Sequence, residues 1–263
     1  MTLKGVTNAI KIKHNRLKSF SFDLRNYEFL YTGSEFCENL LEVYLDTIDI
    51  LKKFDNKICF LTPPVSYKGI DLSFKIFRWL KDNKKNDEIE ITVNDFGTIN
   101  VAREVFGKKI KINLGRHITK HFFSTDKTSI RANSLDCLVF ANKMNIKRFE
   151  ISSFDTVPSH NFDIFKKKRV GFVFSVFYPY VNLTMSRNCL LGMPDNFPSS
   201  TIKSIPCLKE CINGDYYVTN NKTKTDLIAS ENSLFVKNVS DIFLSGKVFK
   251  SIRADRAVYC PFL

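Results

Sequence analysis

The chain has 263 residues, of which 44% are hydrophobic and 25% are charged, proportions ordinary for a soluble globular protein of one large domain or two small ones. No segment reaches the ~18 apolar residues of a membrane span, and residues 1–13 lack the apolar core of a signal peptide, so we expect a cytoplasmic protein without a membrane span. The net charge of +13 permits nucleic-acid binding, but the lysines are scattered along the chain as on a solvated surface.

The chain up to Tyr180 alternates short apolar runs with amphipathic runs of helical spacing. The predicted strands cover residues 19–24, 57–61, 89–93, 110–114, 148–152 and 170–177. The predicted helices cover residues 35–54, 71–83, 98–106, 134–144 and 162–168, with Ser134 as an N-cap. Strands separated by such helical runs indicate βαβ units and a parallel sheet.

About six βα units precede Tyr178, which suits a (β/α) barrel or an open doubly wound sheet. We predict an α/β fold, a TIM-like barrel that is complete, incomplete or distorted, forming a single domain over residues 1–263. Residues 1–180 hold the βα repeats, and residues 181–263 are expected to form a cysteine-bearing loop and closing β segments. In this C-terminal appendage the β-like pieces are residues 216–219, 233–237 and 248–252.

Three cysteines lie in one irregular, proline-containing stretch: Cys189, Cys207 and Cys211. An irregular loop can turn several thiolates toward one metal centre, and thiolates favour zinc or an iron–sulfur cluster. The alternative is that Cys207 and Cys211 are two buried thiols one helical turn apart.

A fourth ligand is expected from the remaining cysteines. Cys59 and Cys137 occupy apolar strand and helix positions typical of core residues, and Cys260 is ambiguous. Cys37 follows a predicted turn after the first strand, at the barrel face where strands end. Barrel closure would bring that turn near the late segments of the chain.

Polar residues also follow two predicted strands. Arg116 could clamp a carboxylate with its planar fork, and Asn94 and Asp95 could bind a hydroxyl group of a ligand. The alternative for Asn94 and Asp95 is that they cap the helix that starts near Thr98.

Several motifs resemble those of the collagenase-like peptidase superfamily, and most closely the UbiV-type accessory proteins of oxygen-independent ubiquinone hydroxylation. They span nearly the whole chain, although the interval between Cys189 and Cys207 is longer than in that pattern. The motifs are YTGSEFC at residues 31–37, NDFG at 94–97, LGR at 114–116, RNC at 187–189, PCLKEC at 206–211 and DRAVY at 255–259.

The resemblance implies a TIM-like barrel with a [4Fe–4S] cluster on Cys37, Cys189, Cys207 and Cys211. It also implies a role in oxygen-independent hydroxylation of a small aromatic substrate in ubiquinone biosynthesis, as a heterodimer with a paralogous subunit. No residue pattern supports peptidase chemistry, so we expect a hydroxylase subunit rather than a protease. The alternatives are a cluster-bearing protein of tRNA or rRNA hydroxylation, and a zinc-binding structural protein or peptidase-family relative without catalysis.

Overall fold

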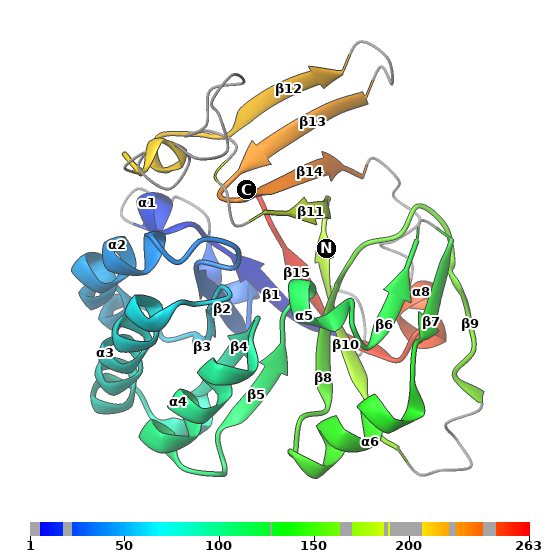
Figure 1. The fold of residues 1–263 in the computed structure, drawn as a ribbon, viewed down its shortest axis with the longest axis horizontal. Helices are drawn as coiled ribbons and strands as arrows, with labels where there is room; N and C mark the ends of the chain where they lie inside the picture. The colour runs from blue at the N-terminus through cyan, green and yellow to red at the C-terminus, as the bar shows by residue number, and fades with distance from the viewer. Residues whose placement is uncertain are drawn as a thin grey trace.

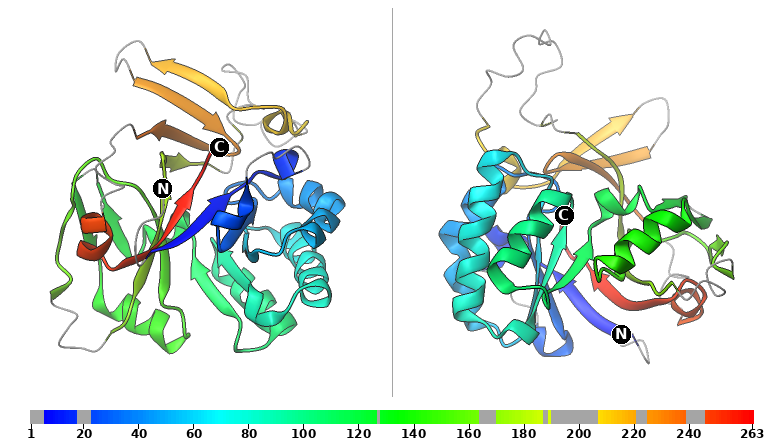
Figure 2. Two further views of the ribbon diagram at one scale, coloured as in Figure 1. Left: turned by 180° about the vertical axis from the view of Figure 1, so that it is seen from behind. Right: turned by 60° about the horizontal axis from the view of Figure 1, so that its bottom comes forward.

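A computed structural model of the chain describes residues 6–17, 23–126, 128–163, 170–186, 189, 207–220, 225–238 and 246–263. Eight parallel strands form a closed barrel in the order β1-β15-β10-β8-β5-β4-β3-β2 (Figure 1). They are β1 (Thr7–Lys11), β2 (Phe29–Gly33), β3 (Lys57–Leu61), β4 (Ile89–Val93), β5 (Lys111–Leu114), β8 (Arg148–Ser152), β10 (Val173–Tyr178) and β15 (Ala254–Tyr259). The barrel closes where β1 pairs with β15, side by side in the rear view of Figure 2. The predicted α/β barrel is therefore confirmed.

Helices cover the outside of the barrel, with α2, α3 and α4 in sequence along one side (Figure 1). The capping side chains are those expected: Asp95 accepts a hydrogen bond from the Thr98 amide at 2.8 Å, and Ser134 accepts one from the Asp136 amide. None of the described helices has the length and apolar character to cross a membrane. The helices are α1 (His14–Leu17), α2 (Leu40–Thr47), α3 (Tyr67–Asn83), α4 (Phe96–Phe106), α5 (Arg116–Thr119), α6 (Leu135–Lys143) and α8 (Gly246–Ser251), with 3-10 turns η1 (Leu24–Asn26), η2 (Ile48–Lys53), η3 (Asn86–Glu88) and η5 (Glu210–Ile212).

The interior of the barrel contains ionisable side chains beside apolar ones, although such interiors are usually filled by branched apolar residues. Strand β8 shows the alternation: Phe149 and Ile151 belong to the main apolar core, whereas Glu150 accepts a hydrogen bond from Thr92 on β4. Inside the barrel, Arg256 on β15 forms a buried ion pair with Glu90 on β4 at 2.7 Å. The barrel therefore encloses ionisable groups that need specific partners.

Two smaller sheets are added to the barrel. The first sheet is antiparallel, with the order β11-β14-β13-β12, and its strands fall between β10 and β15 in the chain. It lies over the mouth of the barrel, the end at which the parallel barrel strands finish (Figure 1). The second has the order β6-β7-β9. Their strands are β11 (Tyr180–Met185), β12 (Tyr216–Asn220), β13 (Thr225–Ser230), β14 (Ser233–Lys237), β6 (Phe123–Thr125), β7 (Ser129–Ala132) and β9 (Ser159–His160).

Three predicted elements differ from the structure. The strand expected at residues 19–24 is wrong where it is described, because Leu24 begins η1, and residues 18–22 lie outside the described residues. The segment read as a turn before Cys37 contains β2, so Cys37 follows the second barrel strand, not the first. Residues 248–252 lie in and just after helix α8, and not in a strand. Most of the helix predicted at 162–168 lies outside the described residues.

Candidate functional site

A buried ion triad stands at the mouth of the barrel. Glu35 follows β2, Arg116 begins α5 after β5, and Lys11 ends β1. The Arg116 Nε and Nη2 atoms donate to the two Glu35 carboxylate oxygens at 2.7 and 2.6 Å, and Lys11 Nζ lies 3.3 Å from Oε2. Burial alone would raise the pKa of Glu35, but Arg116 and then Lys11 lower that pKa to about 2. Glu35 and Arg116 are therefore both ionised at neutral pH.

Arg116 does hold a carboxylate, but that carboxylate belongs to Glu35 of the same chain. Its guanidinium also lies 4.5 Å from the Phe177 ring centroid, and Nη1 donates to Ser152 Oγ at 3.4 Å. The fork predicted for a ligand is thus occupied within the protein, although Arg116 does line the cavity described below.

The side chains of Asn94 and Asp95 form hydrogen bonds with backbone groups of the chain around the barrel mouth. The Asn94 side chain donates to the Glu35 carbonyl at 3.2 Å and accepts from the His117 amide at 3.0 Å. Asp95 caps α4 through Thr98, as the alternative interpretation had it. Neither side chain lines the cavity. Their role in substrate binding stays a prediction.

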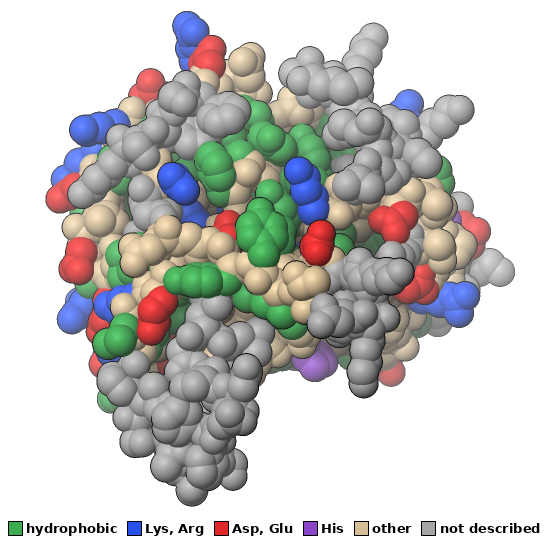
Figure 3. Space-filling view, turned by 90° about the horizontal axis from the view of Figure 1, so that it is seen from above, with side chains coloured by type: hydrophobic (Ala, Val, Ile, Leu, Met, Phe, Trp, Pro, Cys, Tyr) green, Lys and Arg blue, Asp and Glu red, His purple; other side chains and the backbone are tan. Residues whose placement is uncertain are grey.

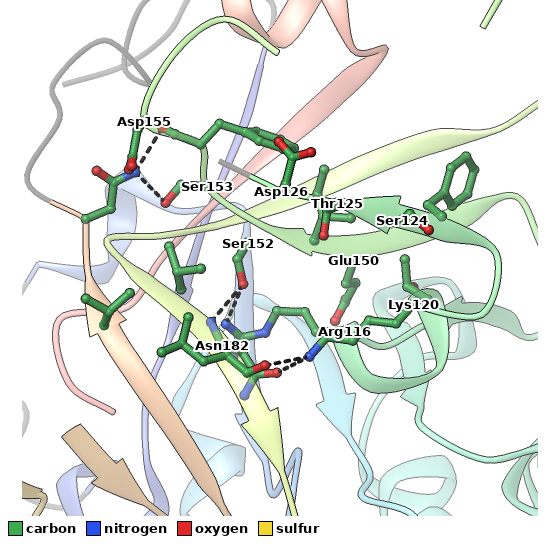
Figure 4. A pocket seen from close by; sticks show the side chains of 18 of the residues that line it. Arg116, Lys120, Ser124, Thr125, Asp126, Glu150, Ser152, Ser153, Asp155 and Asn182 are labelled. Carbon is green, nitrogen blue, oxygen red and sulfur yellow. Dashed lines mark hydrogen bonds between the residues drawn. The ribbon is translucent and has the colours of Figure 1, made fainter. Parts of the chain in front are cut away.

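A cavity of about 650 Å³ lies at the barrel mouth beside β11 and β14, a volume within the range of small-molecule sites (Figure 4). Of its polar residues, Arg116 was predicted from the sequence as a substrate-binding residue, whereas Lys120, Glu150 and Asn182 were not. The lining residues are Arg116, Thr119, Lys120, Phe123, Ser124, Thr125, Asp126, Glu150, Ile151, Ser152, Ser153, Phe154, Asp155, Val181, Asn182, Leu183, Val236, Lys237 and Asn238.

Glu150 is the lining residue with the most perturbed ionisation. The side chain is 0% exposed; Oε1 accepts from Thr92 Oγ1 at 2.8 Å, while Oε2 has no hydrogen-bond partner among the described residues. Burial, and then the nearby Glu35 charge, raise the pKa of Glu150 to about 8, so the carboxyl is mostly protonated at neutral pH. The polar alternation of Arg148, Glu150 and Ser152 in an otherwise apolar strand was the sequence signal for it.

The four predicted cluster ligands come from distant parts of the chain, and the charges of some of them influence the pKa values of others. Cys37 and Cys211 are buried, Cys189 is half-buried and Cys207 is exposed. Burial, and then Glu231, Cys189 and Cys207, raise the pKa of Cys211 to about 12, against a lowering by Lys13. Burial also raises the pKa of Cys37, with contributions from Glu231, Cys211 and Cys207. Each influence requires proximity.

As the side chains stand, no three or more His, Cys, Asp or Glu residues in the described part of the chain form a group that could hold a metal ion. Residues 187–188 and 190–206, which include parts of the two late cysteine motifs, lie outside the described residues. Cys260, the ambiguous candidate, packs in the barrel interior with Phe177 and Val258. The cluster and its ligand set stay a prediction.

The sheet over the mouth is tied to the cysteine turn. Glu231, between β13 and β14, accepts hydrogen bonds from Ser34 Oγ and the Phe36 amide, both at 3.0 Å. Figure 3 looks onto this end of the molecule, where the described Lys and Arg side chains are interspersed with Asp and Glu. This mixed surface does not favour nucleic-acid binding over other partners.

Comparisons with known proteins give little further information. No family model matches the chain, and no curated protein matches it. Chitinase ChiW from Paenibacillus sp. str. FPU-7 is similar at 8% identity and a TM-score of 0.45, over 97% of this chain and 31% of that one. A glycoside hydrolase family 18 N-acetylglucosaminidase from Paenibacillus barengoltzii is similar at 9% identity and a TM-score of 0.35, over 97% of this chain and 94% of that one. Neither likeness carries an argument about activity.

Proposed function

We propose that this chain is an iron–sulfur protein that holds a [4Fe–4S] cluster on Cys37, Cys189, Cys207 and Cys211. The observation that supports the proposal is that Cys207 and Cys211 influence the pKa of Cys37, which follows β2, and that Cys189 and Cys207 influence the pKa of Cys211. Cys207 and Cys211 are tied there by Lys209, whose Nζ lies 3.0 Å from the Glu42 carboxylate on α2.

Four cysteine thiolates are the usual ligands of a [4Fe–4S] cluster, and the motif resemblance assigns these four residues to that role. Burial and Glu231 raise the pKa of Cys211 to about 12 and Lys13 offsets only part of that rise, so the positive charge of bound metal would have to stabilise the thiolate.

The role we propose is oxygen-independent hydroxylation in ubiquinone biosynthesis, with a paralogous partner subunit. The resemblance of the cysteine motifs supports this role, and a bound cluster would supply electron transfer. Within the chain, Glu35 stands two residues before Cys37 and pairs with Arg116, which lines the cavity. The cysteine turn and the cavity are therefore joined by one ion pair.

Protein purified without oxygen is expected to contain about four iron and four sulfide per chain and to absorb visible light. Cys37→Ser and Cys211→Ser should each lose most of the iron, while Cys137→Ser on α6 should keep it as the matched control. Iron and acid-labile sulfide analysis, with an absorption spectrum, measures this. A folded, colourless, iron-free protein would refute the proposal, and one zinc without visible absorption would indicate a structural zinc site.

A further inference from the structure

Lys120 carries a charge that the cavity does not neutralise. Its Nζ donates to Asn182 Oδ1 at 3.0 Å and to the Leu183 carbonyl at 3.5 Å, and both acceptors are uncharged. Among the described residues, no carboxylate lies within ion-pair distance of Lys120. Desolvation and the Arg116 charge lower the pKa of Lys120, as expected for a cation held near another cation.

The other ionisable groups on this wall do not supply the missing anion. Arg116 is balanced by Glu35, and Glu150 carries its proton at neutral pH. Asp126 lies at the exposed rim, where the Ser129 hydroxyl and Thr128 amide hold its oxygens at 2.6 and 2.7 Å. Asp155 and Lys237, which also line the cavity, have opposite charges. The inner wall therefore keeps a net positive charge.

The remaining walls combine apolar side chains with hydroxyl and amide groups. Phe123 and Phe154 are almost fully buried and are joined by aliphatic side chains from β8, β11 and β14. A ligand that fills this space needs a compact apolar body and one anionic group. The aliphatic lining residues are Ile151, Val181, Leu183 and Val236.

We infer that the cavity binds a small aromatic carboxylate, whose anionic group pairs with Lys120 and forms a hydrogen bond with Glu150, whose buried Oε2 atom has no partner among the described residues. Figure 4 shows Lys120, Arg116 and Glu150 in the same part of the cavity. The inference goes beyond the proposed cluster and does not depend on it, because no cysteine lines the cavity.

The test is calorimetric titration of the full-length protein with benzoate and phenylacetate, and with benzamide as the uncharged counterpart. We expect at least one of the two carboxylates to bind. Benzamide should bind at least about tenfold more weakly than that carboxylate. Lys120→Met should weaken carboxylate binding about tenfold or more, whereas Lys237→Met, the other lysine of the cavity, should change it less than about threefold.

The pH dependence of binding tests the role of Glu150. Carboxylate affinity should fall above about pH 8 in the wild-type protein as Glu150 ionises, and Glu150→Gln should remove that part of the fall. Loss of charge on Lys120 affects both proteins equally, so their difference isolates Glu150. The titratable and charged groups around Glu150 are Glu35, Arg116, Arg256, Tyr31, Cys59 and Cys260.

Three outcomes would overturn the inference. They are no binding of either carboxylate, equal binding of benzamide, and equal loss of affinity in Lys120→Met and Lys237→Met. The last outcome would show that the carboxylate binds through the overall positive charge of the protein, and not through a specific contact with Lys120.

Discussion

Replacing Arg116 with methionine is expected to lower the free energy of unfolding by about 3 to 5 kcal/mol. Arg116 and Glu35 are 2% and 0% exposed at their side chains, and two short hydrogen bonds join them. Without the guanidinium, Glu35 keeps only Lys11, at 3.3 Å, as a cationic partner. The largest part of the loss is the cost of a buried carboxylate that has lost its main partner. Urea denaturation near neutral pH measures it.

Two further variants separate that cost from a general effect of losing a cation. Lys111→Met removes an exposed lysine on β5 and should stay within about 0.5 kcal/mol of the wild-type protein. Adding Glu35→Leu and Lys11→Met to Arg116→Met should restore part of the stability, because replacing all three members of the triad leaves none of their charges buried without a partner. A loss below about 1 kcal/mol in Arg116→Met would mean that the triad does not stabilise the barrel mouth.

The repeating part of the fold could be predicted because its strands carry strong local signals. The runs at Lys57–Leu61 and Ile89–Val93 are rich in apolar residues, end at turn residues and match β3 and β4. Strand β1 could not be predicted in the same way, since Thr7–Lys11 is short and mixed in character. It becomes a strand because β2 and β15 pair with it on both sides, and β15 lies far away in the chain.

The ionisable side chains of the interior and the site depend on contacts that sequence spacing does not reveal. A charged residue inside a strand is acceptable only if a partner reaches it, and the partner of Glu90 is Arg256, 166 positions away. Arg116 was correctly placed at a strand end, but the carboxylate it holds could not be foreseen. Lys120 gave no signal, because its importance comes from the absence of a nearby anion among the described residues.

The wild-type protein is expected to lose stability as the pH rises from about 5 to about 8, because of Glu150. Its pKa is 4.5 in the unfolded chain and about 8 in the folded one, so the folded state binds the proton more tightly. The stabilisation is complete below about pH 4.5 and declines by about 1.4 kcal/mol per pH unit as the unfolded state ionises first. It is lost by about pH 8, a total of about 5 kcal/mol.

Glu150→Gln should therefore show a flatter dependence, with a stability relative to the wild-type protein that grows from about pH 5 to about pH 8. Glu35 acts in the opposite sense, since its lowered pKa stabilises the fold above 4.5, and that contribution is lost toward pH 2. Urea midpoints measured above about pH 5 thus separate the two carboxyl groups. Glu104→Gln, at an exposed position on α4, should keep the wild-type slope. Parallel curves of stability against pH for the wild-type protein and Glu150→Gln would mean that Glu150 is ionised in the folded barrel. The protonated Glu150 carboxyl assumed in the cavity would then be wrong.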